Sequence, residues 1–370
     1  MPAVVVCATE SKGAFAMTTA DSLELTSRDR ILVLAPHPDD ESIACGGLLL
    51  AARDAGAERS VIVVTDGDNN PWPQRWIEKR WRIDAAARAR WGARRRAEAG
   101  TALDVLGVAP SQRHFLGLPD SELTALLMRD ARLPSEVGTL IAQMRPTHIA
   151  MPALSDRHPD HSAVHVAALL ALSTTPHAPR LLIYAVHGET AGKGDVLLCL
   201  SDEQQCAKHS AIAAHRTQVR LSGKRFLRFA RGDEHYEAPS VKPRGDLPLR
   251  AALTPGGLEI RVEPDRLRDP PRTLRLCVVI EQPGRESLRR YIPLVDAAGR
   301  ADLQWPGDGR EPASLTWKKE GRTLVTRVAV DVGPGAIAFV KLEKSRRGLV
   351  IYDRYGWQAV ENSTAKLGQI

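Results

Sequence analysis

Ile31–Leu50 have the sequence ILVLAPHPDDESIACGGLLL, and this stretch decides the fold. Five apolar residues at its start, Ile31–Ala35, predict a buried strand. A turn rich in proline and acidic residues follows, and then a helix on which Ile43, Gly47 and Leu50 recur on one face. Ligands of open α/β sheets bind where strands end and helices begin, so this turn is the first candidate for a functional site.

The turn carries one imidazole and three carboxylates where a nucleotide-binding protein would have glycines: His37, Asp39, Asp40 and Glu41. Such side chains are ligands for a divalent metal, or a general base beside one. A purely structural interpretation is also available, because acidic residues in a first helical turn cap free N–H groups and favour the helix dipole. That interpretation does not account for His37.

A second cluster of the same chemistry, His158–His161 (HPDH), follows the apolar run Ile149–Pro152. It is another strand end that carries imidazoles and a carboxylate. Two such turns can meet at the same edge of a sheet, and together they supply a complete set of metal ligands.

The chain of 370 residues is long enough for two domains. Up to about residue 240, strand and helix patterns alternate, which predicts a Rossmann-like, mostly parallel sheet with helices on both faces. Prolines after Glu237 mark a junction, and alternating apolar runs beyond it predict an antiparallel β domain, a small sandwich. We therefore expect an N-terminal extension at 1–29, an α/β domain at 30–238 and a β domain at 239–370. The predicted elements include strands at Ser60–Thr65, Arg113–Leu116, Thr147–Met151, Leu181–Val186, Leu258–Val262, Thr273–Ile280, Leu324–Val332, Ala336–Leu342 and Leu349–Tyr352, and one helix at Asp202–Val219.

Composition excludes several classes of protein. No apolar run approaches the roughly 20 residues of a membrane helix, and the N-terminus lacks the basic region of a signal peptide. Five scattered cysteines without a CxxC motif predict reduced thiols in a cytoplasmic protein. The net charge of +7 arises after residue 240, where no aromatic and basic recognition motif accompanies it, so a nucleic acid partner is not expected.

Residues 71–96 are unusual in composition. Four tryptophans are interleaved with nine basic residues: Trp72, Trp76, Trp81 and Trp91 among Arg75, Lys79, Arg80, Arg82, Arg88, Arg90, Arg94, Arg95 and Arg96. One interpretation is an amphipathic helical segment with packed tryptophans and solvated arginines. The other is a lid or wall over a sugar or a phosphate, because Trp stacks on sugar faces and Arg binds anions.

A catalytic zinc needs about three protein ligands and an open position for water, and His37, Asp40 and His161 provide a set of two imidazoles and a carboxylate. The remaining polar residues of the two motifs then have roles to fill. Asp39 is free to act as the general base toward water. His158 can stabilise an oxyanion and protonate a leaving amine, and Asp160 can hold it in one tautomer. These are the parts needed for metal-assisted amide hydrolysis.

The two motifs, APHPDDE at Ala35–Glu41 and HPDH at His158–His161, resemble the signatures of the PIG-L/LmbE-like deacetylase family. The resemblance covers roughly residues 30–237. Its supporting motifs are Arg95–Glu98, Leu118–Asp120, and Lys208 with His215 and Gln218.

The resemblance implies a zinc-dependent hydrolase that removes an N-acyl group, usually acetyl, from an amino sugar. By motif position it implies one Zn²⁺ per chain, with Fe²⁺ as the alternative ion, held by His37, Asp40 and His161. It also implies Asp39 as base, His158 with Asp160 as the acid and oxyanion pair, and Arg95 and Asp120 as residues that contact the substrate.

From these observations we expect a cytoplasmic N-deacetylase that acts on an amino-sugar-containing small molecule or glycoconjugate. One alternative is a deacylase of a long-chain N-acyl group, a glycopeptide or a lipid-linked sugar. Another is a non-catalytic protein that holds a metal and binds glycans. The β domain is expected either to position an extended or anionic substrate, or to build an oligomer interface, or only to cover the sheet; formation of a homo-oligomer is left open.

Overall fold

The computed structural model describes residues 21–188, 194–239, 247–282, 287–302, 314–331, 333, 335–345 and 352–361. The predicted N-terminal extension up to residue 20, the junction at 240–246 and most of the predicted strand Leu349–Tyr352 lie outside these residues. The chain forms two compact units that are not simply consecutive in sequence. Unit 1 comprises residues 1–121, 144–153 and 179–238, and unit 2 comprises residues 122–143, 154–178 and 239–370.

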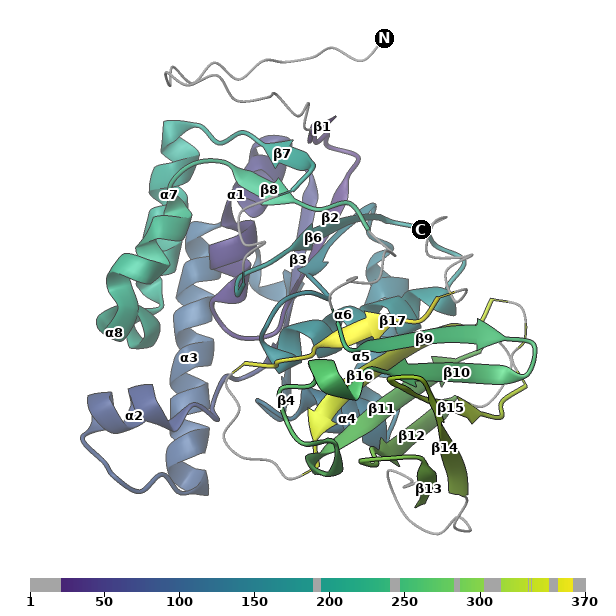
Figure 1. Ribbon diagram of the computed structural model, residues 1–370. Helices are drawn as coiled ribbons and strands as arrows, with labels where there is room; N and C mark the ends of the chain where they lie inside the picture. Colours follow the sequence, from purple (N-terminus) through teal and green to yellow (C-terminus); the bar gives the residue numbers. More distant parts are fainter. Residues whose placement is uncertain are drawn as a thin grey trace, which may run out of the picture. The chain divides into compact units, whose positions relative to one another are not determined.

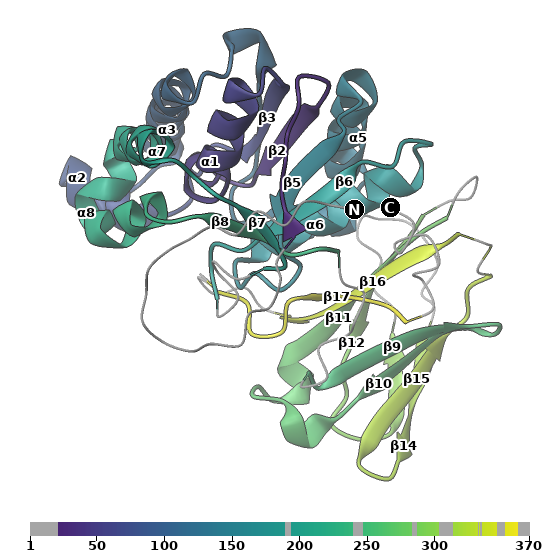
Figure 2. The same ribbon diagram turned by 90° about the horizontal axis from the view of Figure 1, so that it is seen from above.

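Unit 1 is built on a five-stranded sheet in the order β4-β3-β2-β5-β6, in which every neighbouring pair is parallel. Figure 1 labels four of these strands, and Figure 2 labels β5 beside β2. The central strand β2 pairs with β3 on one side, Leu32 opposite Ser60, and with β5 on the other, Leu32 opposite Ile149. The chain thus winds outward from β2 in one direction and then in the other. The point where the direction reverses lies between β2 and β5, where open α/β sheets bind ligands. The strands are β2 Arg30–Ala35, β3 Glu58–Thr65, β4 Arg113–Leu118, β5 His148–Pro152 and β6 Arg180–Tyr184.

Three helices of unit 1, α1 (Asp40–Asp54), α3 (Ala85–Val105) and α7 (Asp202–Ala214), lie side by side next to β2 and β3 (Figure 2). Close packing of α1 requires glycine at position 47, because a Cβ atom there would lie 2.6 Å from Leu200 and 2.8 Å from Glu234. The helices α2 (Pro71–Glu78) and α8 (Arg216–Leu227) and a small sheet of β1 (Asp21–Ser22), β7 (Val196–Leu198) and β8 (Glu234–Tyr236) complete the unit.

The prediction of one helix over Asp202–Val219 is wrong. The chain breaks at His215, whose ψ of 63° is not helical, and a separate helix, α8, starts at Arg216. The break has a physical reason in the contacts of the His215 ring, described below.

Unit 2 combines most of α5 (Arg132–Met144) and two further helices, α4 (Leu123–Arg129) and α6 (Pro159–Ser173), with two antiparallel sheets. The sheet orders are β13-β14-β15-β10-β9 and β12-β11-β16-β17. Apolar residues of both sheets share one core cluster, among them Ile260 on β10, Leu276 on β11 and Trp317 on β14, so the sheets form a sandwich. The strands are β9 Leu249–Thr254, β10 Gly257–Val262, β11 Leu274–Glu281, β12 Leu288–Pro293, β13 Gly299–Asp302, β14 Ser314–Glu320, β15 Thr323–Val328, β16 Ile337–Lys344 and β17 Trp357–Ala359.

The predicted fold class, a mostly parallel sheet with connecting helices and a C-terminal antiparallel β region, is confirmed. The helices of unit 2 are part of the same packing as the sandwich, because α4 contacts β11 and β12, and α6 contacts β16 and β17. A buried lysine, Lys341 on β16, adds a polar link, since its Nζ atom contacts the Asp353 carboxylate and lies 3.3 Å from Thr124 Oγ1 on α4. Among the residues that the structure describes, no helix is both long enough and apolar enough to cross a membrane.

The contacts of α6 generate a prediction about truncation. A chain that ends at Glu237 loses β16 and β17, so the apolar surface of α6 that packs on them becomes exposed. We expect the truncated protein to be insoluble or aggregated, measured as the soluble fraction on expression and by size-exclusion chromatography. A control chain that ends at Glu361 keeps all the described strands and is expected to stay soluble. A monomeric truncated protein with a cooperative unfolding transition would contradict this packing argument.

Candidate active site

The first motif forms the loop between β2 and α1 in unit 1. His37 lies two residues after the end of β2, and α1 starts at Asp40. Asp39 between them has a φ of 143°, a conformation that non-glycine residues rarely adopt. Carboxylates hold the loop in place: Asp40 Oδ2 accepts the N–H of His37 at 3.0 Å, and Glu41 Oε2 accepts the N–H of Asp39 at 3.0 Å. Asp40 and Glu41 thus bind N–H groups of the loop, whereas Asp39, at the N-cap position of α1, makes no side-chain capping hydrogen bond.

The His37 ring lies between two carboxylates. Its Nδ1 atom is 3.3 Å from Asp40 Oδ2, and its Nε2 atom is 3.3 Å from Asp120 Oδ1. Asp120, on the loop after β4, also accepts the N–H of Asn69 at 2.7 Å. Burial alone would raise the pKa of Asp120, but the hydrogen bond and charge of His37 together with the Asn69 N–H hold it well below its usual range. The predicted contact of Asp120 with sugar hydroxyls stays a prediction; in the structure its carboxylate orients His37.

A buried arginine on α3 holds the Asp39 side chain. Arg95 donates to the carbonyl of Gly67 at 2.7 Å, to the carbonyl of Pro38 at 2.8 Å and to Asp39 Oδ2 at 3.1 Å. Burial raises the pKa of Asp39 to about 6, although the Arg95 guanidinium opposes the rise. A carboxylate tuned in this way can take up a proton near neutral pH, as a general base must. That Arg95 contacts a substrate stays a prediction, because its described contacts all lie within the loops of unit 1.

The sequence analysis named Glu41 and His215 but did not predict the buried network that they form next to Asp39. The Nε2 atom of His215 lies 3.0 Å from Glu41 Oε1 and 3.1 Å from Ser42 Oγ, and Ser42 donates to the same Glu41 oxygen at 2.8 Å. Burial alone would lower the pKa of His215, but Glu41 and then Asp39 raise it, which favours the imidazolium form. These contacts account for the break between α7 and α8 at His215. The available signal was three consecutive acidic residues at the start of an otherwise apolar helix.

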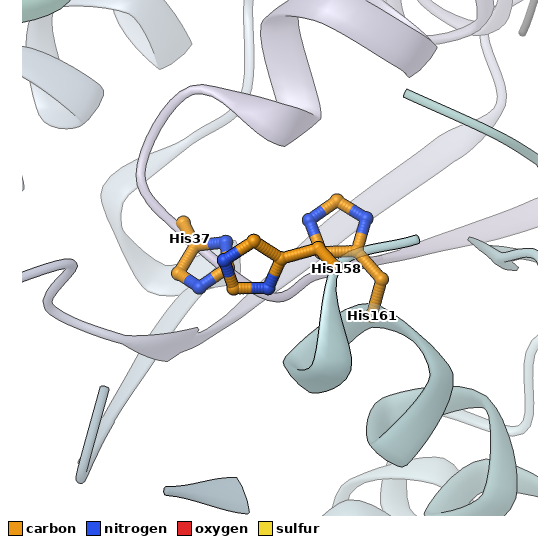
Figure 3. A group of neighbouring side chains, drawn as sticks. All are labelled: His37, His158 and His161. Carbon is orange, nitrogen blue, oxygen red and sulfur yellow. The ribbon is translucent and has the colours of Figure 1, made fainter. Parts of the chain in front are cut away.

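The second motif, in unit 2, forms the first turn of α6. His158 caps this helix, and its Nδ1 atom accepts the N–H of Asp160 at 3.3 Å. The His158 and His161 ring centroids are 5.2 Å apart. Figure 3 draws both side chains at the start of α6, and also draws His37 on the loop after β2.

A further carboxylate that the sequence reasoning missed, Asp156, orders this turn. Its Oδ1 atom accepts the N–H of His158 at 2.9 Å, and its Oδ2 atom lies 3.1 Å from His161 Nδ1. Because Asp156 engages Nδ1, Nε2 is the atom of the His161 ring that can ligate a metal. The Asp160 carboxylate accepts the N–H of Leu123 at 3.2 Å, and its predicted role in fixing the His158 tautomer stays a prediction.

The contacts of Arg95 predict a loss of stability on a conservative change. Arg95→Lys replaces the planar guanidinium by a single ammonium group. The ammonium cannot donate hydrogen bonds to two carbonyls and a carboxylate together. We expect the free energy of unfolding to fall by about 1–3 kcal/mol, the cost of a buried polar group left unsatisfied, measured by urea denaturation. The exposed neighbour Arg94, which pairs with Glu98 at 3.3 Å, provides the control, and Arg94→Lys should change stability by less than about 0.5 kcal/mol. Equal effects of the two changes would show that the Arg95 contacts contribute no stability.

Parts of this chain are similar in sequence to known proteins. Residues 32–172 match the family model described as PIG-L: GlcNAc-PI de-N-acetylase. Two curated relatives are both named 1D-myo-inositol 2-acetamido-2-deoxy-alpha-D-glucopyranoside deacetylase. The protein from Rhodococcus erythropolis is 29% identical over 169 residues, which are 41% of this chain and 55% of the relative. The protein from Nakamurella multipartita is 28% identical over 240 residues, 52% of this chain and 80% of the relative.

The chain spans about half the length of the first of these relatives. Among solved structures, the N,N'-diacetylchitobiose deacetylase from Pyrococcus horikoshii aligns with a TM-score of 0.47 and 20% sequence identity, over 59% of this chain and 88% of that chain. The resemblance to the PIG-L/LmbE-like deacetylase family that the two motifs predict is confirmed over residues 32–172 by the family model.

Proposed function

We propose that this protein hydrolyses the N-acetyl amide of an amino sugar or an amino-sugar conjugate and releases acetate and a free amine. The observation that carries the proposal is the sheet topology. β2 and β5 are adjacent and parallel, and the sheet order reverses between them. The first motif follows the carboxyl end of β2, and only five residues separate the end of β5 from His158. This arrangement supports a single site at the reversal point, supplied by both motifs.

We propose His37, Asp40 and His161 as ligands of one divalent metal ion, Zn²⁺ with Fe²⁺ as the alternative. The donor set fits, because imidazole nitrogen and carboxylate oxygen suit both ions. The contact of Asp156 with His161 supports this assignment, since metal-binding histidines commonly bond a carboxylate through their other nitrogen. When bound, such an ion supplies Lewis acidity toward the amide carbonyl and lowers the pKa of water.

Two residues of the chain then carry out the proton transfers of the proposed reaction. Asp39, with its pKa of about 6 and its carboxylate held by Arg95, takes a proton from the attacking water. His158 gives a proton to the amine as the C–N bond breaks. This step requires the imidazolium form of the ring, which becomes neutral as the proton passes to the amine, because a neutral imidazole is too weak an acid. Asp160 is the proposed partner that orients His158, and Arg95 and Asp120 are the proposed residues for contact with the sugar.

The proposed substrate class is supported by the relatives, whose names describe an acetamido sugar joined to inositol. For this chain we propose an amino-sugar-containing small molecule or glycoconjugate. A cytoplasmic location is proposed from the cysteines, because three of those in the described residues, Cys45, Cys206 and Cys277, are free thiols.

We also propose that the catalytic domain spans 30–238 and that residues 239–370 take no part in chemistry. The contacts of α6 with β16 and β17 support a structural role for the second region, since α6 carries the second motif. The sandwich would then fix the helix from which His158 and His161 project.

The ligand assignment predicts metal content. His37→Ala, Asp40→Ala and His161→Ala should each lower the zinc bound per chain in the purified protein, measured by elemental analysis, because each removes one of three ligands. His209→Ala, at an exposed position on α7, is the control and should leave zinc content unchanged. Full occupancy in His161→Ala would refute the assignment, whereas higher activity with Fe²⁺ would change only the identity of the ion.

The general base assignment predicts a change in turnover alone. Asp39→Asn should keep the metal and lower kcat by roughly 10²–10⁴-fold, because an amide cannot accept the proton. The assay is acetate release from N-acetylated amino sugars, offered free, nucleotide-linked and lipid-linked. Asp54→Asn at the other end of α1 is the control and should retain full kcat. If the metal-loaded wild-type protein releases acetate from none of these compounds but binds them, the non-catalytic alternative is the correct one.

A further inference from the structure

Three tryptophans of unit 1 are exposed together on one short segment. The exposed fractions are 53% for Trp72, 72% for Trp76 and 78% for Trp81, whereas Trp91 on α3 is buried. Trp72 and Trp76 lie one turn apart on α2, and Trp81 follows in the loop before α3. Figure 1 shows α2, this loop and α3. We call Pro71–Arg82 the Trp/Arg segment. Large apolar side chains gathered in this way on a surface mark a site of interaction.

The same region is strongly basic. Residues 71–96 contain nine arginines and lysines against two acidic residues, Glu78 and Asp84, an excess that equals the net charge of the whole chain. Three basic residues that flank Trp81 are exposed: Lys79, Arg80 and Arg82. Within the described residues, none of these three forms an ion pair. The Trp/Arg segment therefore presents uncompensated positive charge beside apolar rings.

The Trp/Arg segment is held in place. Gln74 is fully buried on the opposite face of α2 and donates to the carbonyl of Ala87 on α3 at 2.7 Å. The Arg75 guanidinium lies over two of the exposed rings, 5.1 Å from the Trp72 centroid and 5.4 Å from the Trp81 centroid. Arg75 also donates to the carbonyl of Trp81 at 2.9 Å. The rings are thus presented by a fixed turn.

We propose that the Trp/Arg segment binds the surface of a bilayer that contains anionic phospholipids. Small ligands bury most of their surface in concave pockets, and a ring that is 72% or 78% exposed does not line one. An extended, flat partner fits such rings better. Tryptophan prefers the membrane–water interface, and lysine and arginine are attracted to anionic headgroups. A short amphipathic helix with both features lies in the plane of the interface and does not span it.

A single-stranded nucleic acid is the other partner that combines aromatic and basic side chains. It stacks bases on open ring faces. Here Arg75 already covers one face of Trp72 and one face of Trp81, so the stacking surface is reduced. Insertion of ring edges into a headgroup layer needs no open face, which favours the bilayer.

The test is binding of the full-length, metal-loaded protein to vesicles, measured by co-sedimentation and by the shift of tryptophan fluorescence. We expect binding to phosphatidylcholine vesicles that contain about one third phosphatidylglycerol, and much weaker binding to phosphatidylcholine alone. Trp76→Ala with Trp81→Ala, and separately K79Q/R80Q/R82Q, should each lower the partition coefficient by about ten-fold or more. The tryptophan double variant should also lose the blue shift of fluorescence.

The matched control removes the same charge elsewhere. K318Q/K319Q/R322Q changes three exposed residues of unit 2 and should bind vesicles as the wild type does. An equal loss in this control would show that only net charge matters, and it would overturn the proposal, as would wild-type binding in both segment variants. If the segment variants lose binding to a single-stranded oligonucleotide and the wild type does not bind anionic vesicles, the partner is a nucleic acid and the proposal is wrong. Acetate release from a free N-acetyl sugar is measured in parallel and should not change in any variant.

Discussion

Unit 1 depends on the pairing of buried charged groups in the loop between β2 and α1. Within five residues the chain carries one imidazole and three carboxylates into the interior. Burial of an unpaired charge costs several kcal/mol, so each of these groups needs a partner. Arg95 from α3 and His215 from the break between α7 and α8 supply positive charge, which ties two distant parts of the chain to this one loop.

The balance of this network bears on the proposed metal. The contacts join four carboxylates, those of Asp39, Asp40, Glu41 and Asp120, to one arginine and two imidazoles. With all four carboxylates ionised, negative charge is in excess even when both rings are protonated. A divalent cation would remove this excess and would release His37 from its place between two carboxylates. The charge balance of this loop therefore supports the proposed metal site.

Much of this organisation was accessible from the sequence, and the failures have identifiable physical causes. Periodicity located the strands because β2 and β3 are buried on both faces and carry continuous apolar runs. It could not find the break at His215, because that break depends on a contact with Glu41, distant in sequence. Nor could it choose among the arginines at 94–96. Only the packing of α3 shows that Arg95 points inward while its two neighbours are exposed. Asp156 was missed because its role depends on where the chain turns before α6.

The division of unit 2 into three separate segments has a consequence for how the protein is made. During synthesis α4 and α6 leave the ribosome long before β16 and β17, the strands on which α6 packs. Domains generally fold as units from the N-terminus, but the nascent chain cannot complete this one until its last strands have appeared. The apolar surface of α6 is exposed throughout that interval, and such surface is prone to aggregate. Folding of the second motif is thereby coupled to completion of the chain, so a prematurely terminated product would lack a properly supported α6.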